Sequence, residues 1–248
     1  MTIAIIPARF HSTRFPGKLL QLIHGKSVLE HAYNHAIKSN CFDRVVISTP
    51  DLNIKEHAEK FRANVVLTPY ECPNGTYRAL KTLQVDPSLN NANIIINIQA
   101  DHPKFAPSTV AALIDILKIS DDADMATPVY KFSDPKKAQD PSVVKCLFDH
   151  ENNAIYFSRS PIPYYRDTTM TKSYYHHLGI YAYKRSFLEK IEHLPHSYLE
   201  QAEGLEQLKF LEFGYRIKIA VVDEDDYSVD TPSDIEKVKN KLLLTKEF

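Results

Sequence analysis

Apolar and amphipathic segments alternate along the first half of the chain. Short continuous apolar runs are typical of strands that are covered on both faces, and between them apolar residues recur every three or four positions, as in helices. The pattern predicts strands at 2–7, 44–49, 63–68 and 92–99, and helices at 27–39, 53–61, 75–84 and 108–119. Because strands and helices alternate with short links, we expect right-handed βαβ units in an α/β fold with a mostly parallel central sheet.

The pattern changes after residue 124. Strand-like segments then follow one another without helices between them, at 124–132, 142–149, 153–158 and 174–184. The remaining segments predict helices at 185–194, 198–214 and 231–244 and a strand at 215–222. Gly214 marks a helix C-terminus, and Thr231 and Pro232 mark an N-cap and a first helical position. We therefore expect one domain over 1–248, with a smaller mixed-strand insertion at about 124–185.

Composition narrows the classes of function. With 30 basic and 31 acidic residues in 248, the net charge of −1 provides no field to hold nucleic acid, so we expect none as a partner. The three cysteines are far apart and form no CxxC pair, which argues against a disulfide framework or a structural zinc site. No apolar run approaches twenty residues and no signal-like segment is present, so we expect a cytoplasmic protein without membrane association.

Three cations lie in the loop that follows the first predicted strand. Arg9, Arg14 and Lys18 are accompanied by Ser12 and Thr13, and arginine and lysine suit phosphate oxygens. Ligands of open α/β sheets bind beyond the carboxyl ends of strands, where this loop lies. Neither a Walker A loop nor a G-x-G-x-x-G fingerprint is present. The alternative is a solvated loop whose cations pair with nearby carboxylates.

Two aspartates are candidates for a metal site. Asp101 follows the apolar strand at 92–99, and Asp230 lies between the last strand and the last helix. Mg²⁺ prefers one or two carboxylates together with substrate phosphates. Alternatively, Asp101 bonds its own turn and Asp230 interacts with the dipole of the helix that follows it.

Together these clusters resemble the 3-deoxy-manno-octulosonate cytidylyltransferases, the CMP-Kdo synthetases. The resemblance extends over nearly the whole chain, in matching order. It rests on eight motifs: IIPARFHSTRFPGK (5–18), NGTYR (74–78), NIQADHP (97–103), VKCLFD (144–149), IYFSRSPIP (155–163), HLGIYAYK (177–184), LEQLKFLEFG (205–214) and VDTPSDIEKV (229–238).

The resemblance implies a GT-A-like, Rossmann-type nucleotidyltransferase that joins CTP to a sugar acid for lipopolysaccharide or surface-glycan synthesis. It also implies Mg²⁺ as cofactor and a homodimer, with the strand-rich insertion serving sugar binding and dimerisation. By position, Arg9, Arg14 and Lys18 hold the triphosphate, and Asp101 and Asp230 bind Mg²⁺. The other implied nucleotide-binding residues are Pro7, Ala8, Ser12, Asn74, Gly75 and Arg78. The implied sugar-binding residues are Gln99, Arg159, His177, Tyr181, Glu206 and Gln207.

Several of these residues also have an ordinary structural interpretation. In this interpretation, Arg159 pairs with a surface carboxylate, His177 is a hydrogen-bonded core histidine, and Tyr181 packs among apolar neighbours. Glu206 and Gln207 form an exposed helix face.

Four residues depart from the family pattern. Tyr77 stands where the family has the acid of G-T-E-R, and Pro50 where it has the aspartate of T-D. Ala100 replaces a glycine, which adds a methyl group, and His102 replaces a glutamate. The changes favour altered acceptor specificity, for 8-amino-Kdo or a nonulosonic acid, over lost nucleotide binding. They also leave open a non-catalytic or weakly active CTP-binding paralogue. A sugar-1-phosphate nucleotidyltransferase is disfavoured, because its opening loop is usually glycine-rich.

Overall fold

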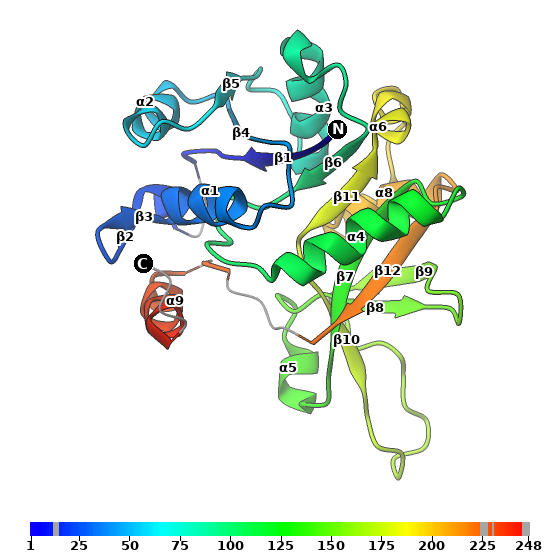
Figure 1. Ribbon diagram of the computed structural model, residues 1–248. Coiled ribbons are helices and arrows are strands. Elements are labelled where there is room, and N and C mark those ends of the chain that lie inside the picture. Colours follow the sequence, from blue (N-terminus) through cyan, green and yellow to red (C-terminus); the bar gives the residue numbers. More distant parts are fainter. Residues whose placement is uncertain (12–14, 224–227, 230, 245–248) are drawn as a thin grey trace. The chain divides into compact units, whose positions relative to one another are not determined.

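The computed structural model describes residues 1–11, 15–223, 228–229 and 231–244 of the chain (Figure 1). The chain divides into two compact units, one of residues 1–107 with 226–248 and the other of residues 108–225. The expected single domain stays a prediction. Within the described ranges, no helix has both the length and the apolar character needed to cross a membrane.

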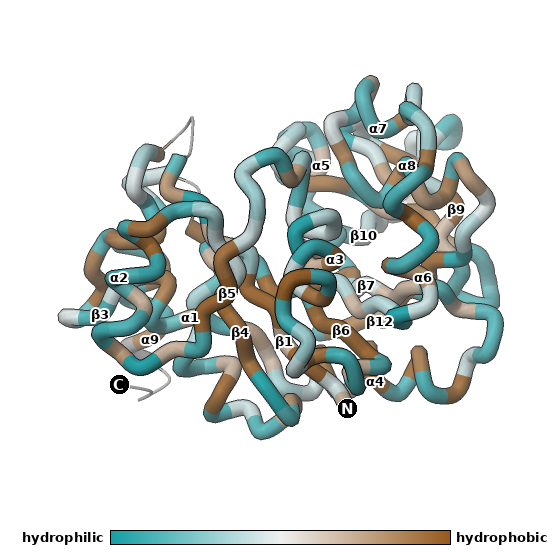
Figure 2. Tube along the Cα trace, turned by 90° about the horizontal axis from the view of Figure 1, so that it is seen from above, coloured by the Kyte–Doolittle hydropathy of each residue, from teal (hydrophilic) through white to brown (hydrophobic). Residues whose placement is uncertain are grey.

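The first unit contains a parallel sheet of four strands. Its order is β5 (Val65–Leu67), β4 (Arg44–Thr49), β1 (Thr2–Pro7) and β6 (Ile94–Asn97), with Ala4 beside both Val45 and Ile96. Each strand lies within a run that the apolar pattern predicts. The strands are short apolar segments, coloured brown in Figure 2, and Ile3, Ile5 and Ile6 are fully buried.

Helices connect these strands as the pattern predicts. The connecting helices are α1 (Val28–Lys38), α2 (Leu52–Lys60) and α3 (Gly75–Val85), and α9 (Pro232–Leu244) is the last element of the chain. The unit also has short 3-10 helices at Lys18–Leu20 and Pro87–Leu89 and a small hairpin of β2 (Leu22–Ile23) and β3 (Lys26–Ser27). Ser27 caps α1 by accepting the N–H of Glu30 at 3.1 Å. Within α1, Tyr33 is buried, whereas Ile37 is 48% exposed.

The strand order fixes where a ligand site is expected. In chain order the four strands are arranged 3-2-1-4, so β1 and β6 are the neighbours at which the direction of winding reverses. Ligands of open α/β sheets bind at the carboxyl ends of the strands at such a reversal point. The loop with Arg9 follows β1, and the segment with Asp101 follows β6.

The second unit is built around β7 (Met125–Phe132). This strand pairs antiparallel with β10 (Tyr174–His177) and β11 (Tyr181–Lys184), and parallel with β12 (Ile217–Val222). Antiparallel pairing continues from β10 to β8 (Lys145–Phe148) and β9 (Ala154–Ser158). The mixed strand directions confirm the expected change of pattern after residue 124.

Two predictions for the second unit, one of a helix and one of a strand, need correction. The first concerns its helices. They are α4 (Pro107–Ile119), which begins at the unit boundary, α5 (Pro135–Gln139), α6 (Arg185–Ile191), α7 (Tyr198–Glu203) and α8 (Glu206–Glu212). The single helix expected over 198–214 is wrong, because Gly204 adopts φ +63° and ends α7. The single strand expected over 174–184 is also wrong, since β10 and β11 are separated by residues 178–180. Gly214, at φ +79°, follows α8 as expected.

Candidate active site

A cavity of about 380 Å³ lies at the carboxyl ends of β1 and β6, where the strand order favours a ligand. Three stretches that are far apart in the sequence line it: the loop after β1, the start of α3 and the segment after β6. The lining residues are Pro7, Arg9, His11, Lys18, Leu19, Asn74, Gly75, Arg78, Gln99, Ala100 and Asp101. The resemblance assigns a role to all but His11, Leu19 and Ala100.

Of the remaining residues predicted for nucleotide or metal binding, only Ala8 is described, and it does not line the cavity. Ala8 is fully buried, and its N–H donates to the carbonyl of Ser48 at 2.9 Å, so it belongs to the packing behind the loop. Ser12, Arg14 and Asp230 lie outside the described residues.

The start of α3 approaches the end of β6 closely. Asn74 is the N-cap, and its side chain accepts the N–H of Tyr77 at 3.1 Å. A Cβ atom on Gly75 would lie 2.9 Å from Nδ2 of Asn97, so a larger residue there would require the Asn97 side chain to shift. Asn97 is a buried polar residue behind the cavity lining that sequence reasoning did not single out. The sequence feature that could have indicated Asn97 is a polar residue at the end of an apolar strand.

Two arginines offer unused hydrogen-bond donors beside the cavity. Arg78 is 1% exposed, and its Nη1 donates to the Thr68 hydroxyl at 2.6 Å and the Pro69 carbonyl at 3.3 Å. Nη2 of Arg78 and Nη2 of Arg9 are buried, and neither has a hydrogen-bond partner within the described part of the chain. Burial lowers the pKa of Arg78, and the nearby charge of Arg9 adds to this effect. Buried donors without acceptors are costly, so these groups favour an anionic or acceptor-rich ligand.

Lys18 and Asp101 form an ion pair at the edge of the cavity. Gly17 adopts φ +69° and precedes the 3-10 helix that carries Lys18, which turns the lysine back toward β6. Burial alone would raise the pKa of Asp101, but the charges of His102 and Lys18 together lower it. Asp101 is therefore an ionised acceptor at neutral pH.

Asp101 has the chemistry of a Mg²⁺ ligand that is shared with a substrate. A carboxylate oxygen is a hard donor, and Mg²⁺ takes few protein ligands when phosphates are present. The Asp101 carbonyl accepts the N–H of Val229 at 2.9 Å, so the residue before Asp230 lies against Asp101. Across the described ranges, no group of three or more His, Cys, Asp or Glu side chains is arranged to hold a metal. The donor set fits a metal held jointly by protein and substrate, and does not fit a closed structural site.

Three departures from the family pattern have local physical explanations. Ala100 does not have a positive φ, so its backbone needs no glycine. Tyr77 is the third residue of α3, where an acid would complete a capping box with the N-cap. His102 is 7% exposed, and its Nε2 lies 3.8 Å from the Asp101 carboxylate, so it adds positive charge beside the candidate metal ligand when protonated.

The fourth departure, Pro50, shifts an aspartate by one position. Asp51 accepts the N–H of Phe10 at 2.8 Å and so holds the loop that carries Arg9. The carboxylate thus anchors the opening loop despite the proline before it.

In the second unit, Arg159 is held by backbone carbonyls. Its Nε donates to Glu203 at 2.7 Å, Nη1 to Pro141 at 2.8 Å and Nη2 to Gly204 at 3.3 Å. The alternative interpretation, in which the Arg159 guanidinium pairs with a surface carboxylate, does not describe these contacts. The Glu203 carboxylate instead accepts the N–H of Arg159 at 2.9 Å. Two guanidinium N–H groups remain for a ligand.

Beside Arg159 lies a lysine that sequence reasoning missed. Lys145 is fully buried in β8, and its ammonium donates to the carbonyls of Asp140, Val143 and Arg159 at 3.2, 2.6 and 2.5 Å. Three acceptors use all three N–H groups of a charged ammonium. Burial lowers the pKa of Lys145, and Asp140 and Glu203 oppose this shift.

The other predicted sugar-binding residues of this unit are His177, Tyr181, Glu206 and Gln207. His177 is 7% exposed, and its Nε2 lies 2.9 Å from the Thr127 hydroxyl, as in a core histidine. The Tyr181 hydroxyl donates to Oε1 of Gln207 at 3.2 Å, and burial raises the pKa of Tyr181 well above its ordinary value. Nε2 of Gln207 is buried without a hydrogen-bond partner in the described chain, so the expected exposed face is wrong for Gln207. Glu206 is the first residue of α8 and is partly exposed.

Comparison with known proteins identifies relatives over the full length of the chain. The cytidylyltransferase family model matches residues 3–219. The 3-deoxy-manno-octulosonate cytidylyltransferase of Protochlamydia amoebophila is 40% identical over 248 residues, covering 99% of this chain and 96% of the relative. The 8-amino-3,8-dideoxy-manno-octulosonate cytidylyltransferase of Shewanella frigidimarina is 39% identical over 241 residues, covering 97% and 98%.

A solved structure extends the similarity to the fold. The CMP:2-keto-3-deoxy-manno-octonic acid synthetase complexed with CTP has a TM-score of 0.90 at 34% identity, covering 100% of this chain and 99% of that one. HddC from Yersinia pseudotuberculosis has a TM-score of 0.67 at 15% identity, covering 97% and 99%, and shares the fold. The expected nucleotidyltransferase fold class is confirmed. The chain belongs to the 3-deoxy-manno-octulosonate cytidylyltransferase family.

Proposed function

We propose that the protein transfers CMP from CTP to Kdo or a closely related 3-deoxy-ulosonic acid, and releases pyrophosphate, for lipopolysaccharide or surface-glycan synthesis. The observation that carries this proposal is the cavity at β1 and β6, which combines unused arginine donors with an ionised aspartate. The relatives' names supply the nucleotide and the sugar acid. The three cysteines are free, which supports the reducing cytoplasm as its location, and fractionation of cells that express the protein tests this.

The residues of the cavity divide the work of binding. Arg9 and Lys18 neutralise the phosphate oxygens, with Arg14 in the same role by its place in the motif. Arg78 and Asn74 lie at the start of α3 and bind the cytidine end of the nucleotide. Gly75 leaves room for close approach there.

The reaction is an in-line displacement at the α-phosphorus. The acceptor hydroxyl forms the new oxygen–phosphorus bond and loses its proton, while the bond to the bridging oxygen breaks and pyrophosphate leaves. Arg9 and Lys18 stabilise the charge that develops on the leaving group. Asp101, together with Asp230 by its place in the motif, would hold Mg²⁺, which when bound would supply Lewis-acid charge neutralisation and lower the pKa of the hydroxyl.

The sugar acid has candidate partners in the second unit. Arg159 retains two N–H groups and is rigidly held by three carbonyls, which suits a carboxylate. Gln207 retains a buried amide N–H for a sugar hydroxyl. His177 and Tyr181 are already hydrogen-bonded within the protein, so Arg159 and Gln207 are the stronger candidates for contact with the sugar acid.

A pyrophosphate-release assay with CTP and Mg²⁺ tests the function. We expect turnover with Kdo or 8-amino-Kdo to exceed that with sialic acid at least tenfold, because the cited relatives act on the octulosonates that their names give. Replacing CTP by UTP should lower the rate by a similar factor. Binding of CTP without release of pyrophosphate with any ulosonic acid would instead support the non-catalytic paralogue.

We further propose that the protein acts as a homodimer. Support comes from large apolar side chains of the second unit that are exposed in the single chain: Ile155 at 60%, Tyr164 at 88% and Met170 at 57%. Light scattering during size-exclusion chromatography should give twice the 28.4 kDa mass of the chain. A monomer at micromolar concentration would contradict the proposal.

A further inference from the structure

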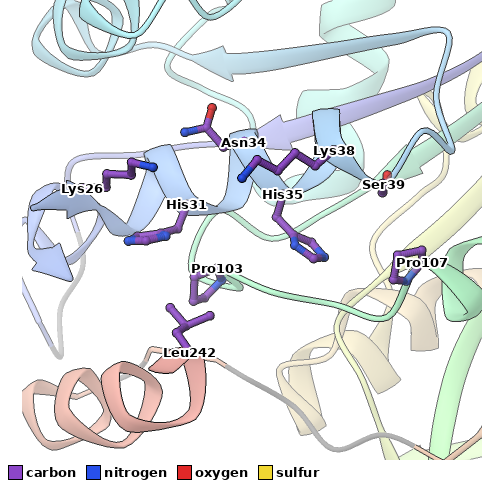
Figure 3. Close-up of a pocket in the computed structure, with 9 residues that line it drawn as sticks. All are labelled: Lys26, His31, Asn34, His35, Lys38, Ser39, Pro103, Pro107 and Leu242. Carbon is purple, nitrogen blue, oxygen red and sulfur yellow. The ribbon is translucent and has the colours of Figure 1, made fainter. Parts of the chain in front are cut away.

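A second cavity, of about 160 Å³, lies in the first unit between α1, the segment 103–107 and α9 (Figure 3). Residues 31, 34, 35 and 38 line it from one face of α1, as their helical spacing requires. The complete lining is Lys26, His31, Asn34, His35, Lys38, Ser39, Pro103, Pro107 and Leu242. The proposed nucleotidyl transfer assigns no role to any of these residues.

Two histidines hold the walls of this cavity in place. Nε2 of His31 donates to the Ile23 carbonyl at 2.7 Å, and Nε2 of His35 donates to the Phe105 carbonyl at 2.6 Å. A carbonyl only accepts, so both rings carry a proton on Nε2. His35 thereby ties the segment 103–107 to α1.

The charge of the cavity is positive and unbalanced. Among the described residues, no aspartate or glutamate lines it, and the ammonium groups of Lys26 and Lys38 have neither a hydrogen bond nor an ion pair there. In Figure 3 the two lysine side chains extend toward one another along α1, with Asn34 between them. Glu30, the nearby acid of α1, interacts electrostatically with His31 but does not line the cavity. Two like charges that face a shared space repel one another, and an anion between them removes this repulsion.

We propose that this cavity binds free inorganic phosphate or pyrophosphate, bridged by Lys26 and Lys38 with the amide of Asn34 as a further donor. Its size favours a small ion, because pockets for larger organic ligands begin at about 300 Å³. Pro103 and Leu242 supply apolar walls on the side opposite α1.

An anion bound in the second cavity would contact segments that also carry the candidate metal ligands of the first cavity. Pro103 lies two residues after Asp101, and α9, which carries Leu242, begins two residues after Asp230. An anion that holds these walls against α1 therefore stabilises the segments that follow the two candidate metal ligands in the chain. Phosphate or pyrophosphate should accordingly raise the melting temperature of the protein.

The test is a titration of phosphate and of pyrophosphate at constant ionic strength, followed by the ¹⁵N signals of histidine side chains and by calorimetry. We expect the signals of His31 and His35 to shift, and K26M/K38M to weaken the binding that causes these shifts by about ten- to a hundredfold, as expected for lost charge-assisted contacts. Lys60→Met, an exposed lysine of α2, is the matched control and should leave the titration unchanged.

A background variant separates this cavity from the first one, which also suits phosphate. In Lys18→Met the shifts of His31 and His35 should persist, since Lys18 lines only the first cavity among the two described here. Shifts that vanish in Lys18→Met, that persist in K26M/K38M or that chloride reproduces would overturn the proposal. The readout is binding, so it stands or fails independently of the proposed transfer activity.

Discussion

Asp101→Asn should lower the rate of pyrophosphate release by about a thousandfold or more, because transfer at phosphorus depends on charge neutralisation at fixed positions. The substitution keeps the size of the side chain but removes the charge that pairs with Lys18 and that would bind Mg²⁺. CTP binding should fall much less, since Arg9 and Arg78 retain their unused donors. Single-turnover rates and calorimetry with CTP measure the two effects separately.

The control must separate lost chemistry from lost folding. The lowered pKa of Asp101 means that its charged form stabilises the fold above its ordinary pKa, and that this contribution is lost as the pH falls through the lowered value. Asp101→Asn should therefore reduce the melting temperature slightly at pH 7 while the circular dichroism spectrum is unchanged. Asp115→Asn, on the exposed face of α4, should change neither rate nor stability. A rate for Asp101→Asn within tenfold of the wild type would contradict the assigned role.

Lys145→Met should destabilise the protein by about 3–5 kcal/mol, because the fully buried ammonium donates to three carbonyls, and those of Val143 and Arg159 are left without this donor, whereas the Asp140 carbonyl still accepts the N–H of Val143. In a chain of this size such a loss lowers the melting temperature by roughly 10 °C. The change acts on β8 and on the loop of Arg159, since the Arg159 carbonyl is one of the three acceptors. Urea denaturation and calorimetry measure the free energy of unfolding.

A graded series makes this prediction robust. Lys145→Gln retains two N–H donors and should lose less stability than Lys145→Met. Lys131→Met, at an exposed position of β7, should stay within about 0.5 kcal/mol of the wild type. The prediction is refuted if Lys145→Met unfolds at the same urea concentration as Lys131→Met.

The parallel half of the fold could be predicted because its signals are local. Strands β1, β4, β5 and β6 are apolar runs, and Ser27 and Asn74 are polar residues directly before amphipathic helices. The errors lie where one residue interrupts a periodic pattern. Gly204 at φ +63° splits the helix expected over 198–214, and its left-handed backbone conformation does not alter the apolar period around it.

The sequence predicts which charged residues belong to the candidate site, but it does not predict which of them contact one another. Arg9, Lys18 and Asp101 were found because charged side chains directly follow apolar strands. That Lys18 pairs with Asp101, and that Asp51 binds the opening loop at Phe10, depends on backbone positions that are far apart in the sequence. For the same reason the burial of Lys145 could not be predicted: in the sequence it is an ordinary strand lysine, but in the structure it is fully buried.

The sequence by itself determined the family, the strand and helix periods of the first unit, and the motifs that carry the cations and the aspartate. These properties follow from local patterns and from the order of motifs. Only the tertiary structure decided which donors stay unused, that Gly75 lies against Asn97, and that Arg159 is held by carbonyls. The physical reason is that burial and hydrogen-bond satisfaction are set by contacts between distant segments. Arg78 illustrates both parts, because its place in NGTYR was visible in the sequence while its buried, unpaired Nη2 was not.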